Sequence, residues 1–410
     1  MNRISIATFL LILTPLILTS CSKQPSVQKP FIEKINIFEA NTGGYALYRI
    51  PGIVITTKGT LLAYCEARQS LKGDWGKIDI LMRRSTDGGK TWEPARKIVT
   101  PPADATHNPV SIQQNLAKKG QITVNNPVAI VDQQTGRIHF LYCIEYARCF
   151  YMYSDDDGMT FSEPVEITRT FEAFRPEYDW KVLATGPGHG IQLISGRLIV
   201  PVWLSTGEGG HAHRPSCISS IYSDDHGKTW YCGEIIAKDP DPLRNPSETV
   251  ALQLKDGRVM FNIRNESKVH RRAVAFSPDG ASNWTTPVFD EALYEPICMA
   301  SIVRYSIKPK NRILFSNPDS HHKSTVDKPS RSRENLTIKL SYDEGRSWPI
   351  AKSLEKGVSG YSDLAVGLDG TIYCFYERGS ISSSHYNPKY LCVARFNLEW
   401  LTDGMDSPHK

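Results

Sequence analysis

Short apolar runs, many of them rich in aromatic residues, recur along the chain and predict β-strands. Pairs of these runs are split by tight-turn signals such as Asp256-Gly257, which predict β-hairpins. The six signals begin at residues 58, 135, 195, 256, 310 and 369, a mean spacing of about 62 residues. A repeat of this length predicts that one hairpin unit occurs several times.

A second repeat interleaves with the first. The pattern Ser-x-Asp-x-Gly-x-Thr followed by an aromatic residue begins at Ser85, Ser154 and Ser223. A copy with Ser in place of Thr begins at Ser341, and a degenerate copy begins at Ser277. The pattern suits a hairpin turn, because Asp accepts backbone N–H groups and Gly supplies a positive φ. This is the Asp-box, whose role is structural, so we assign it no chemistry.

Together the two repeats predict an all-β fold, a six-bladed β-propeller with four strands in each blade. Each blade would contain an early hairpin and a second hairpin closed by the Asp-box. The sixth blade lacks a box, and we expect the early strand at residues 35–38 to close the ring there. A β-sandwich is the alternative, but it predicts no recurrence near 62 residues.

The first residues predict export rather than folding. Arg3 precedes an apolar run at residues 4–18, which at about 15 residues is short for a membrane span. The run ends in Leu-Thr-Ser-Cys21, which resembles a bacterial lipobox; an ordinary secretory signal is the alternative. We therefore expect a signal peptide at 1–21 with a lipidated Cys21, a tether at 22–34 and one propeller domain at 35–405. The mature protein would be held in the bacterial cell envelope by its lipid.

Composition excludes other classes of partner and cofactor. The 410 residues include 48 basic and 43 acidic ones, and no dense Lys/Arg run is present, which argues against nucleic acid. Eight cysteines follow Cys21 without Cys-x-x-Cys or zinc-like spacing, so we expect no metal. Their even number permits disulfides in an exported protein, but we expect mostly free, buried thiols. His211 and His213 lie in a Gly-rich loop, which we expect to be a flexible rim loop; a metal-binding histidine pair is the alternative.

Hairpin symmetry brings distant polar residues together, because residues equidistant from a turn face each other. Three pairs fulfil this condition: Glu248 with Arg264, Tyr361 with Glu377, and Arg49 with Arg68. A surface ion pair would explain any one of them, but three at the same register predict one cavity around the propeller axis. Clustered arginines repel each other in a low dielectric, so they predict an anion site. Asn126 and His189 are further candidates for its mouth.

The segment Tyr48-Arg49-Ile50-Pro51, followed by Asp-boxes, resembles the bacterial exo-α-sialidases (neuraminidases) over about residues 35–405. The resemblance implies hydrolysis of terminal sialic acid from sialylated glycoproteins, gangliosides or oligosaccharides, without a cofactor. It also implies that Arg49, Arg264 and Arg333 clamp the sugar carboxylate; Arg331 is the rival of Arg333.

The resemblance implies roles for the other site residues as well. Asp74 would be the acid/base, Tyr361 the nucleophile and Glu248 its assisting carboxylate. Glu377 would brace the first arginine, and Arg68 would line the pocket near the ring hydroxyls of the sugar. A tyrosine suits this reaction, because the carboxylate on the anomeric carbon would repel a carboxylate nucleophile.

Three alternatives remain open. A trans-sialidase, intramolecular or intermolecular, would use the same residues with a different acceptor. A catalytically silent sialoglycan-binding propeller would need the arginines but not the proton-transfer groups, and a structural scaffold would need neither. The presence of Asp74, Glu248 and Tyr361 favours the enzyme.

Overall fold

The computed structural model describes residues 29–305, 310–325, 328–382 and 384–408. Cys21 and the expected signal peptide lie outside the described residues. Regular structure in these ranges is nearly all β, which confirms the predicted class. The helices are short: α1 (Pro109–Gln113), α2 (Leu398–Leu401) and the 3-10 helices η1 (Thr168–Phe174) and η2 (His321–Lys323). No helix among the described residues is both long and apolar enough to cross a membrane.

The described strands pair into five sheets, and four of these follow one another from the first to the fourth hairpin signal. The first contains β2 (Leu47–Ile55), β3 (Leu61–Arg68), β4 (Ile78–Ser85) and β5 (Arg96–Lys97). The second contains β6 (Val124–Val131), β7 (Ile138–Ile144), β8 (Arg148–Ser154), β9 (Val165–Glu166) and β11 (Gly188–His189). The third contains β10 (Val182–Thr185), β12 (Ile191–Gln192), β13 (Leu198–Ser205), β14 (Ser216–Ser223), β15 (Tyr231–Cys232) and β16 (Ala237–Lys238). The fourth contains β17 (Thr249–Gln253), β18 (Val259–Ile263), β19 (Arg271–Ser277) and β20 (Val288–Tyr294).

The fifth sheet has seven strands, because one long strand takes part in two sets. It contains β21 (Ser301–Tyr305), β22 (Arg312–Pro318), β23 (Glu334–Ser341), β24 (Ile350–Val366), β25 (Ile372–Arg378), β26 (Tyr390–Phe396) and β1 (Ile32–Glu39). The first half of β24 pairs with β23 and the second half with β25. Divided there, the fifth sheet contributes two sets of strands, one on each side of the middle of β24.

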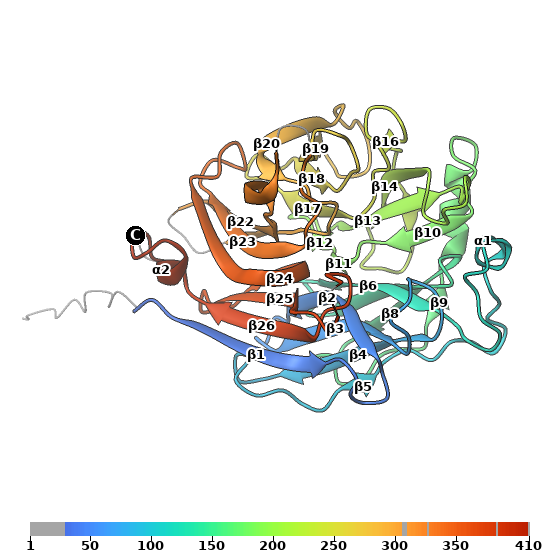
Figure 1. The fold of residues 1–410 in the computed structure, drawn as a ribbon, viewed down its shortest axis with the longest axis horizontal. Coiled ribbons are helices and arrows are strands. Elements are labelled where there is room, and N and C mark those ends of the chain that lie inside the picture. Colours follow the sequence, from blue (N-terminus) through green and yellow to red (C-terminus); the bar gives the residue numbers. More distant parts are fainter. Residues whose placement is uncertain (1–28, 306–309, 326–327, 383, 409–410) are drawn as a thin grey trace, which may run out of the picture.

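The units follow one another around a centre near which β2, β6, β11, β17 and β24 lie (Figure 1). The early strand β1 pairs antiparallel with β26 and so completes the last unit, as predicted. It begins at Ile32, three residues before the expected start of the propeller. The hydrophobic core is divided into clusters of buried side chains, such as the one that joins residues of β1, β2, β3 and β25.

Hydrogen bonds of the Asp-boxes support their structural role. In all five, the Ser hydroxyl donates to the Asp carboxylate and accepts a glycine N–H at 2.8–2.9 Å. In the second box, Asp156 also accepts the N–H of Thr160 at 2.8 Å and its hydroxyl at 2.6 Å. The carboxylates are therefore used within the turns.

Two of the three predicted cross-strand pairs are confirmed by the register. Arg264 lies opposite Glu248, because Thr249 pairs with Ile263 and the N–H of Arg264 donates to the Glu248 carbonyl. Tyr361 lies opposite Glu377, because Ser362 pairs with Tyr376, although a β-bulge between Ser359 and Ser362 sets both Gly360 and Tyr361 against Glu377.

The predicted pairing of Arg49 with Arg68 is wrong. Arg49 pairs with Glu66, and Arg68 pairs with Leu47. Ile55 pairs with Leu61, so the hairpin is already one residue out of the predicted register, and a β-bulge between Arg49 and Gly52 adds one more residue to β2. Turn signals locate a hairpin, but they do not reveal a bulge beyond it.

Candidate active site

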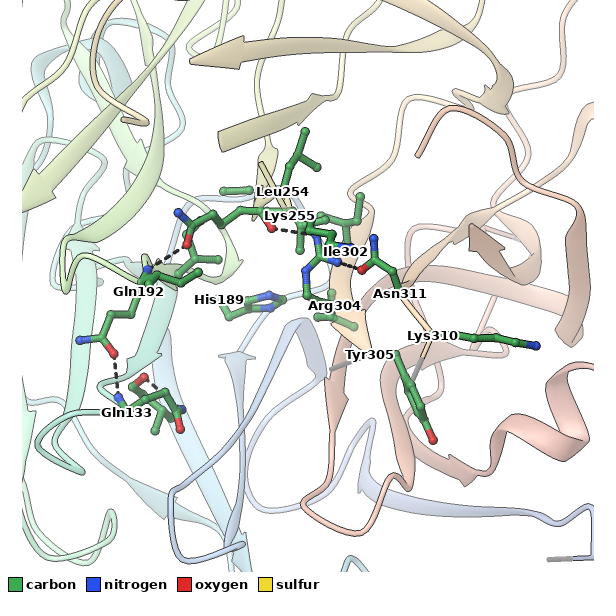
Figure 2. Close-up of a pocket in the computed structure, with 17 residues that line it drawn as sticks. Gln133, His189, Gln192, Leu254, Lys255, Ile302, Arg304, Tyr305, Lys310 and Asn311 are labelled. Atoms are coloured by element: carbon green, nitrogen blue, oxygen red, sulfur yellow. Dashed lines mark hydrogen bonds between the residues drawn. The ribbon is translucent and has the colours of Figure 1, made fainter. Parts of the chain in front are cut away.

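Two cavities lie at opposite ends of first hairpins. The larger of these two, about 700 Å³, lies at the turn ends (Figure 2). Its polar side chains already bind their neighbours: Gln192 accepts the Gln133 N–H at 2.7 Å, and Arg304 pairs with Glu344 at 2.8 Å. His189 lines this cavity and binds Asp363 at 2.7 Å, so the expectation that it lies at the mouth of the anion site is wrong.

The second cavity, about 260 Å³, opens at the other ends of the same hairpins and gathers the predicted residues. It is lined by Arg49, Arg68, Asp74, Glu248, Arg264, Arg333 and Tyr361, together with Asn126. Glu377 lies directly behind them and contacts Arg49. Arg331 is not among the lining residues. We therefore take this cavity as the candidate active site.

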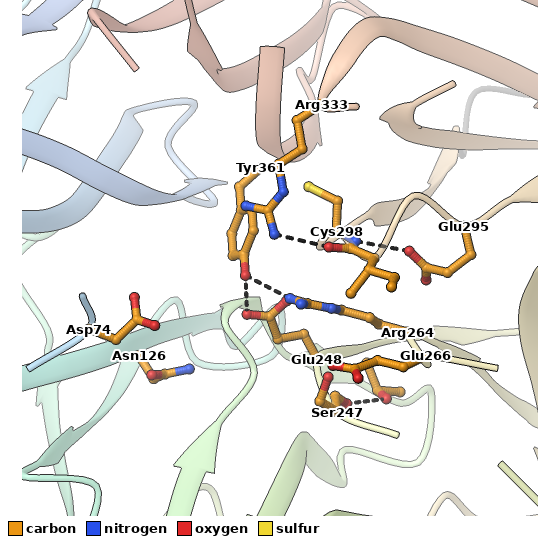
Figure 3. A network of polar contacts seen from close by, with 12 residues as sticks. Asp74, Asn126, Ser247, Glu248, Arg264, Glu266, Glu295, Cys298, Arg333 and Tyr361 are labelled. Atoms are coloured by element: carbon orange, nitrogen blue, oxygen red, sulfur yellow. Dashed lines mark hydrogen bonds and ion pairs between the residues drawn. The ribbon is translucent and has the colours of Figure 1, made fainter. Parts of the chain in front are cut away.

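Tyr361, Glu248 and Arg264 form a hydrogen-bonded group in this cavity (Figure 3). The Tyr361 hydroxyl from β24 donates to Glu248 Oε1 at 2.5 Å and accepts Arg264 Nη1 at 2.7 Å. Arg264 also forms an ion pair with Glu248. Burial raises the pKa of Tyr361 above its ordinary value despite the nearby arginines, so the free protein holds a neutral phenol beside a carboxylate.

Glu377 positions both Arg49 and the backbone of Tyr361. Its carboxylate accepts Arg49 Nε at 2.9 Å and the Tyr361 N–H at 3.0 Å. Its side chain is only 1% exposed. A Cβ on Gly360 would collide with Glu377 Oε2, so this close approach requires glycine. The predicted contact between Glu377 and Arg49 is therefore present.

Three guanidinium groups surround the ring of Tyr361. Their central carbons lie 5.1 Å (Arg49), 5.0 Å (Arg333) and 6.0 Å (Arg264) from the ring centroid. Arg333 donates to the Ile297 carbonyl at 2.9 Å, and no described carboxylate lies within ion-pair distance of it. This excess of positive charge is suited to an anionic ligand.

Asp74 is held at the cavity by Arg68. Arg68 Nη1 donates to Asp74 Oδ1 at 2.8 Å, while its other donors bind Glu66 and the Gly73 carbonyl. The Asp74 side chain is 41% exposed and the Arg68 side chain 3%. Burial opposes ionisation of Asp74, but Arg68, His213 and Arg49 outweigh it and lower its pKa below the ordinary value.

Arg68 lines the cavity, as the resemblance implies, and forms four hydrogen bonds with protein groups, two of them to Glu66. Its expected place near the ring hydroxyls of a sugar stays a prediction. Glu66 also accepts the Asn126 N–H at 2.9 Å. Arg68 is therefore a positioning residue for Asp74. Sequence analysis missed Glu66, although it alternates with Arg68 on the same strand.

We expect Arg68→Gln to move the alkaline limb of the kcat/KM profile to higher pH. In the acid role that the resemblance implies for Asp74, this limb reflects loss of the Asp74 proton, and removal of the guanidinium that lowers the Asp74 pKa raises that pKa. Arg68→Lys keeps the charge and should move the limb less. A pH profile of sialoside turnover checks this; an unchanged or lower limb in Arg68→Gln would contradict the assignment.

Aromatic side chains form the wall beside Asp74, and sequence analysis did not predict them. The Tyr146 ring lies 4.7 Å from Trp75 and 4.8 Å from His213, and the Trp203 ring lies 5.1 Å from His213. Burial lowers the pKa of His213 to about 4, so it is neutral at pH 7. In the described ranges no group of three His, Cys, Asp or Glu side chains could hold a metal ion.

The fold and the cavity together define an Asp-box β-propeller with a cationic site around a buried tyrosine. The family model described as "BNR repeat-like domain" matches residues 106–374, and the BNR/Asp-box repeat model matches residues 83–94. The chain belongs to this BNR repeat-like family.

Curated and solved relatives carry the name sialidase. A sialidase of Micromonospora viridifaciens is 31% identical over 87% of this chain and 52% of its own length. A sialidase of Bacteroides fragilis is 29% identical over 84% of this chain and 62% of its own length. The structure of "Hadza microbial sialidase Hz136" superposes with a TM-score of 0.71 at 28% identity, covering 90% of this chain and 69% of that one. The chain thus spans 52% and 62% of the length of these two curated relatives.

Proposed function

We propose that the protein is an exo-α-sialidase that releases terminal sialic acid with net retention. The observation that carries the proposal is the contact of Tyr361 with Glu248 inside a ring of three arginines. A carbohydrate-binding protein gains nothing from a phenol hydrogen-bonded to a carboxylate. A glycosidase acting on an anionic sugar needs this arrangement.

In the proposed mechanism the arginines bind the sugar carboxylate and hold the anomeric carbon over Tyr361. The Tyr361 oxygen attacks that carbon, and its proton passes to Glu248 Oε1, which already accepts its hydrogen bond. Asp74 donates a proton to the departing glycosidic oxygen. Water then attacks the glycosyl-tyrosine, Asp74 takes the proton of this water, and Glu248 returns its proton to the departing Tyr361 oxygen. Two displacements at one carbon give retention.

Asp74 must be protonated to act as the acid, although Arg68 favours its ionised form in the free protein. Its side chain lies across the cavity from Tyr361 and Glu248 (Figure 3). The remainder of a bound glycan would cover this 41% exposed carboxyl and remove water from it. Loss of water raises the pKa of a carboxyl, so substrate binding would promote its protonation.

The proposed substrates are sialylated glycoproteins, gangliosides or oligosaccharides, and no cofactor takes part. We also propose that lipidated Cys21 anchors the protein in the bacterial cell envelope, as its leader sequence predicts. Mass analysis of the intact protein from a bacterial membrane fraction tests this. A lipid mass on Cys21 supports the anchor, whereas cleavage without lipid supports an ordinary secretory signal.

Turnover of 4-methylumbelliferyl N-acetylneuraminic acid by the purified protein and by Asp74→Asn tests the activity. We expect wild type to release the fluorophore and free α-sialic acid, seen by NMR before mutarotation. An anhydro-sugar or a sialylated acceptor would identify a trans-sialidase instead. No release by folded wild type would favour a binding protein. The 4-methylumbelliferyl group leaves as an acidic phenol and needs little acid assistance. Asp74→Asn should therefore lose more activity on sialyllactose than on this substrate.

A further inference from the structure

Two cysteines face each other just below a hairpin tip that reaches the active-site cavity. Cys143 in β7 pairs in register with Cys149 in β8. Residues 145–147 form the tip between these strands, and Tyr146 lines the cavity. Both cysteines are fully buried free thiols in the structure.

The backbone bonds of Cys149 define the kind of pairing. Its N–H donates to the Thr168 hydroxyl at 2.9 Å, and its carbonyl accepts the Ile167 N–H at 2.8 Å, both away from Cys143. Cys143 and Cys149 are therefore a non-hydrogen-bonded pair, the kind whose Cα atoms lie about 4.5 Å apart in antiparallel sheets. That separation is within the range of about 4.4–6.8 Å that a disulfide spans.

The tip above the two cysteines is strained. Glu145 and Tyr146 have φ values of 54° and 50°, in the left-handed region that non-glycine residues rarely adopt. The tip is held by the Glu145 carboxylate, which accepts the Thr123 N–H at 2.7 Å, and by packing of Tyr146 on Trp75. A covalent bond at the base of the hairpin would reduce the number of other backbone conformations that the tip can adopt.

We propose that Cys143 and Cys149 form a disulfide when the chain folds in an oxidising compartment, and that this bond holds the tip that places Tyr146 in the active-site cavity. The expected export signal would deliver the chain to such a compartment. The second half of the proposal rests on the proposed sialidase function, whereas the first half does not.

The chemistry needs a disulfide oxidant of low molecular weight, such as oxidised glutathione. One cysteine thiolate attacks it and releases one reduced glutathione, and the other thiolate attacks the mixed disulfide and releases the second. Two thiols become one disulfide while one glutathione disulfide becomes two thiols. Burial raises the pKa of Cys149 well above its ordinary value, so exchange occurs during folding or local opening rather than in the closed hairpin.

Peptide mapping of the full chain tests the bond without reference to activity. The protein is refolded with a glutathione redox buffer, denatured with iodoacetamide and digested with trypsin. Cleavage after Arg148 separates the cysteines, so the disulfide should join peptide 138–148 to peptide 149–169, and reduction should separate them. Cys374 and Cys392 serve as the control, because each faces another residue and they should be alkylated. Alkylation of both Cys143 and Cys149 after oxidative refolding would overturn the proposal.

Kinetics of the oxidised and reduced proteins test whether the disulfide keeps the hairpin tip, and with it Tyr146, in place. We expect reduction to raise KM several-fold with little change in kcat, because a less ordered Tyr146 makes binding costlier. Cys143→Ser and Cys149→Ser should each have the KM of the reduced protein, and their KM should not change with the redox buffer. An unchanged KM in a protein shown to carry the bond would overturn the second half. Absence of any turnover would instead contradict the proposed function and leave the mapping result valid.

Discussion

Tyr361→Phe should lower kcat for sialoside hydrolysis by about three orders of magnitude or more while the protein still binds sialic acid. The change removes the attacking oxygen but keeps the ring around which the three arginines lie. Glu248 loses one hydrogen bond but keeps its ion pair with Arg264, so no buried charge becomes unpaired. Steady-state turnover and calorimetric titration with sialic acid measure the two effects separately.

Tyr373→Phe is the matched control, because it removes a buried hydroxyl from the neighbouring strand β25. That hydroxyl donates to the Gly88 carbonyl at 3.2 Å, outside the cavity. We expect it to leave kcat unchanged and to lower only stability. Near-normal turnover by folded Tyr361→Phe would remove Tyr361 from the role of nucleophile, and equal losses in both variants would indicate a general packing defect.

The fold was predictable because turn-forming residues recur at a regular spacing along the sequence. Asp-box glycines and hairpin signals mark the ends of strands, and their spacing counts the units without knowledge of any side-chain contact. The same signals placed Glu248 opposite Arg264, and they placed Tyr361 opposite Glu377 although a bulge lies beside Tyr361. The bulge after Arg49 was not predictable, because one extra residue in a strand leaves no periodic signal.

The site was predictable as a set of residues but not as a set of contacts. Family resemblance brought Asp74 and Arg333 to the cavity, although neither belongs to a symmetric hairpin pair. The resemblance placed Arg68 at the cavity too. It did not predict the bonds of Arg68 to Glu66 and Asp74, because these depend on how the three side chains pack together. The aromatic wall of Trp75, Tyr146 and His213 comes from three separate connections between strands, and nothing local in the sequence relates them.

Arg264→Ala should remove most of the preference of the protein for a ligand with a free carboxylate. We expect wild type to bind sialic acid about 100-fold more tightly than its methyl ester, since a buried, charge-assisted contact is lost on esterification. Without Arg264, one of three clamp donors is missing, so the acid should bind more weakly while the ester changes little. Calorimetric titration of both ligands measures this difference, and it does not depend on catalysis.

The same substitution should also lower kcat, because Arg264 donates to the Tyr361 hydroxyl and neutralises Glu248. Arg214→Ala is the control: Arg214 lines the same cavity but pairs with Glu266 at its side, so its loss should preserve discrimination between acid and ester. Thermal unfolding of each variant separates folding from binding. If Arg264→Ala kept the full wild-type preference for the acid, the carboxylate would have to bind elsewhere, and the orientation of the sugar over Tyr361 would lose its basis.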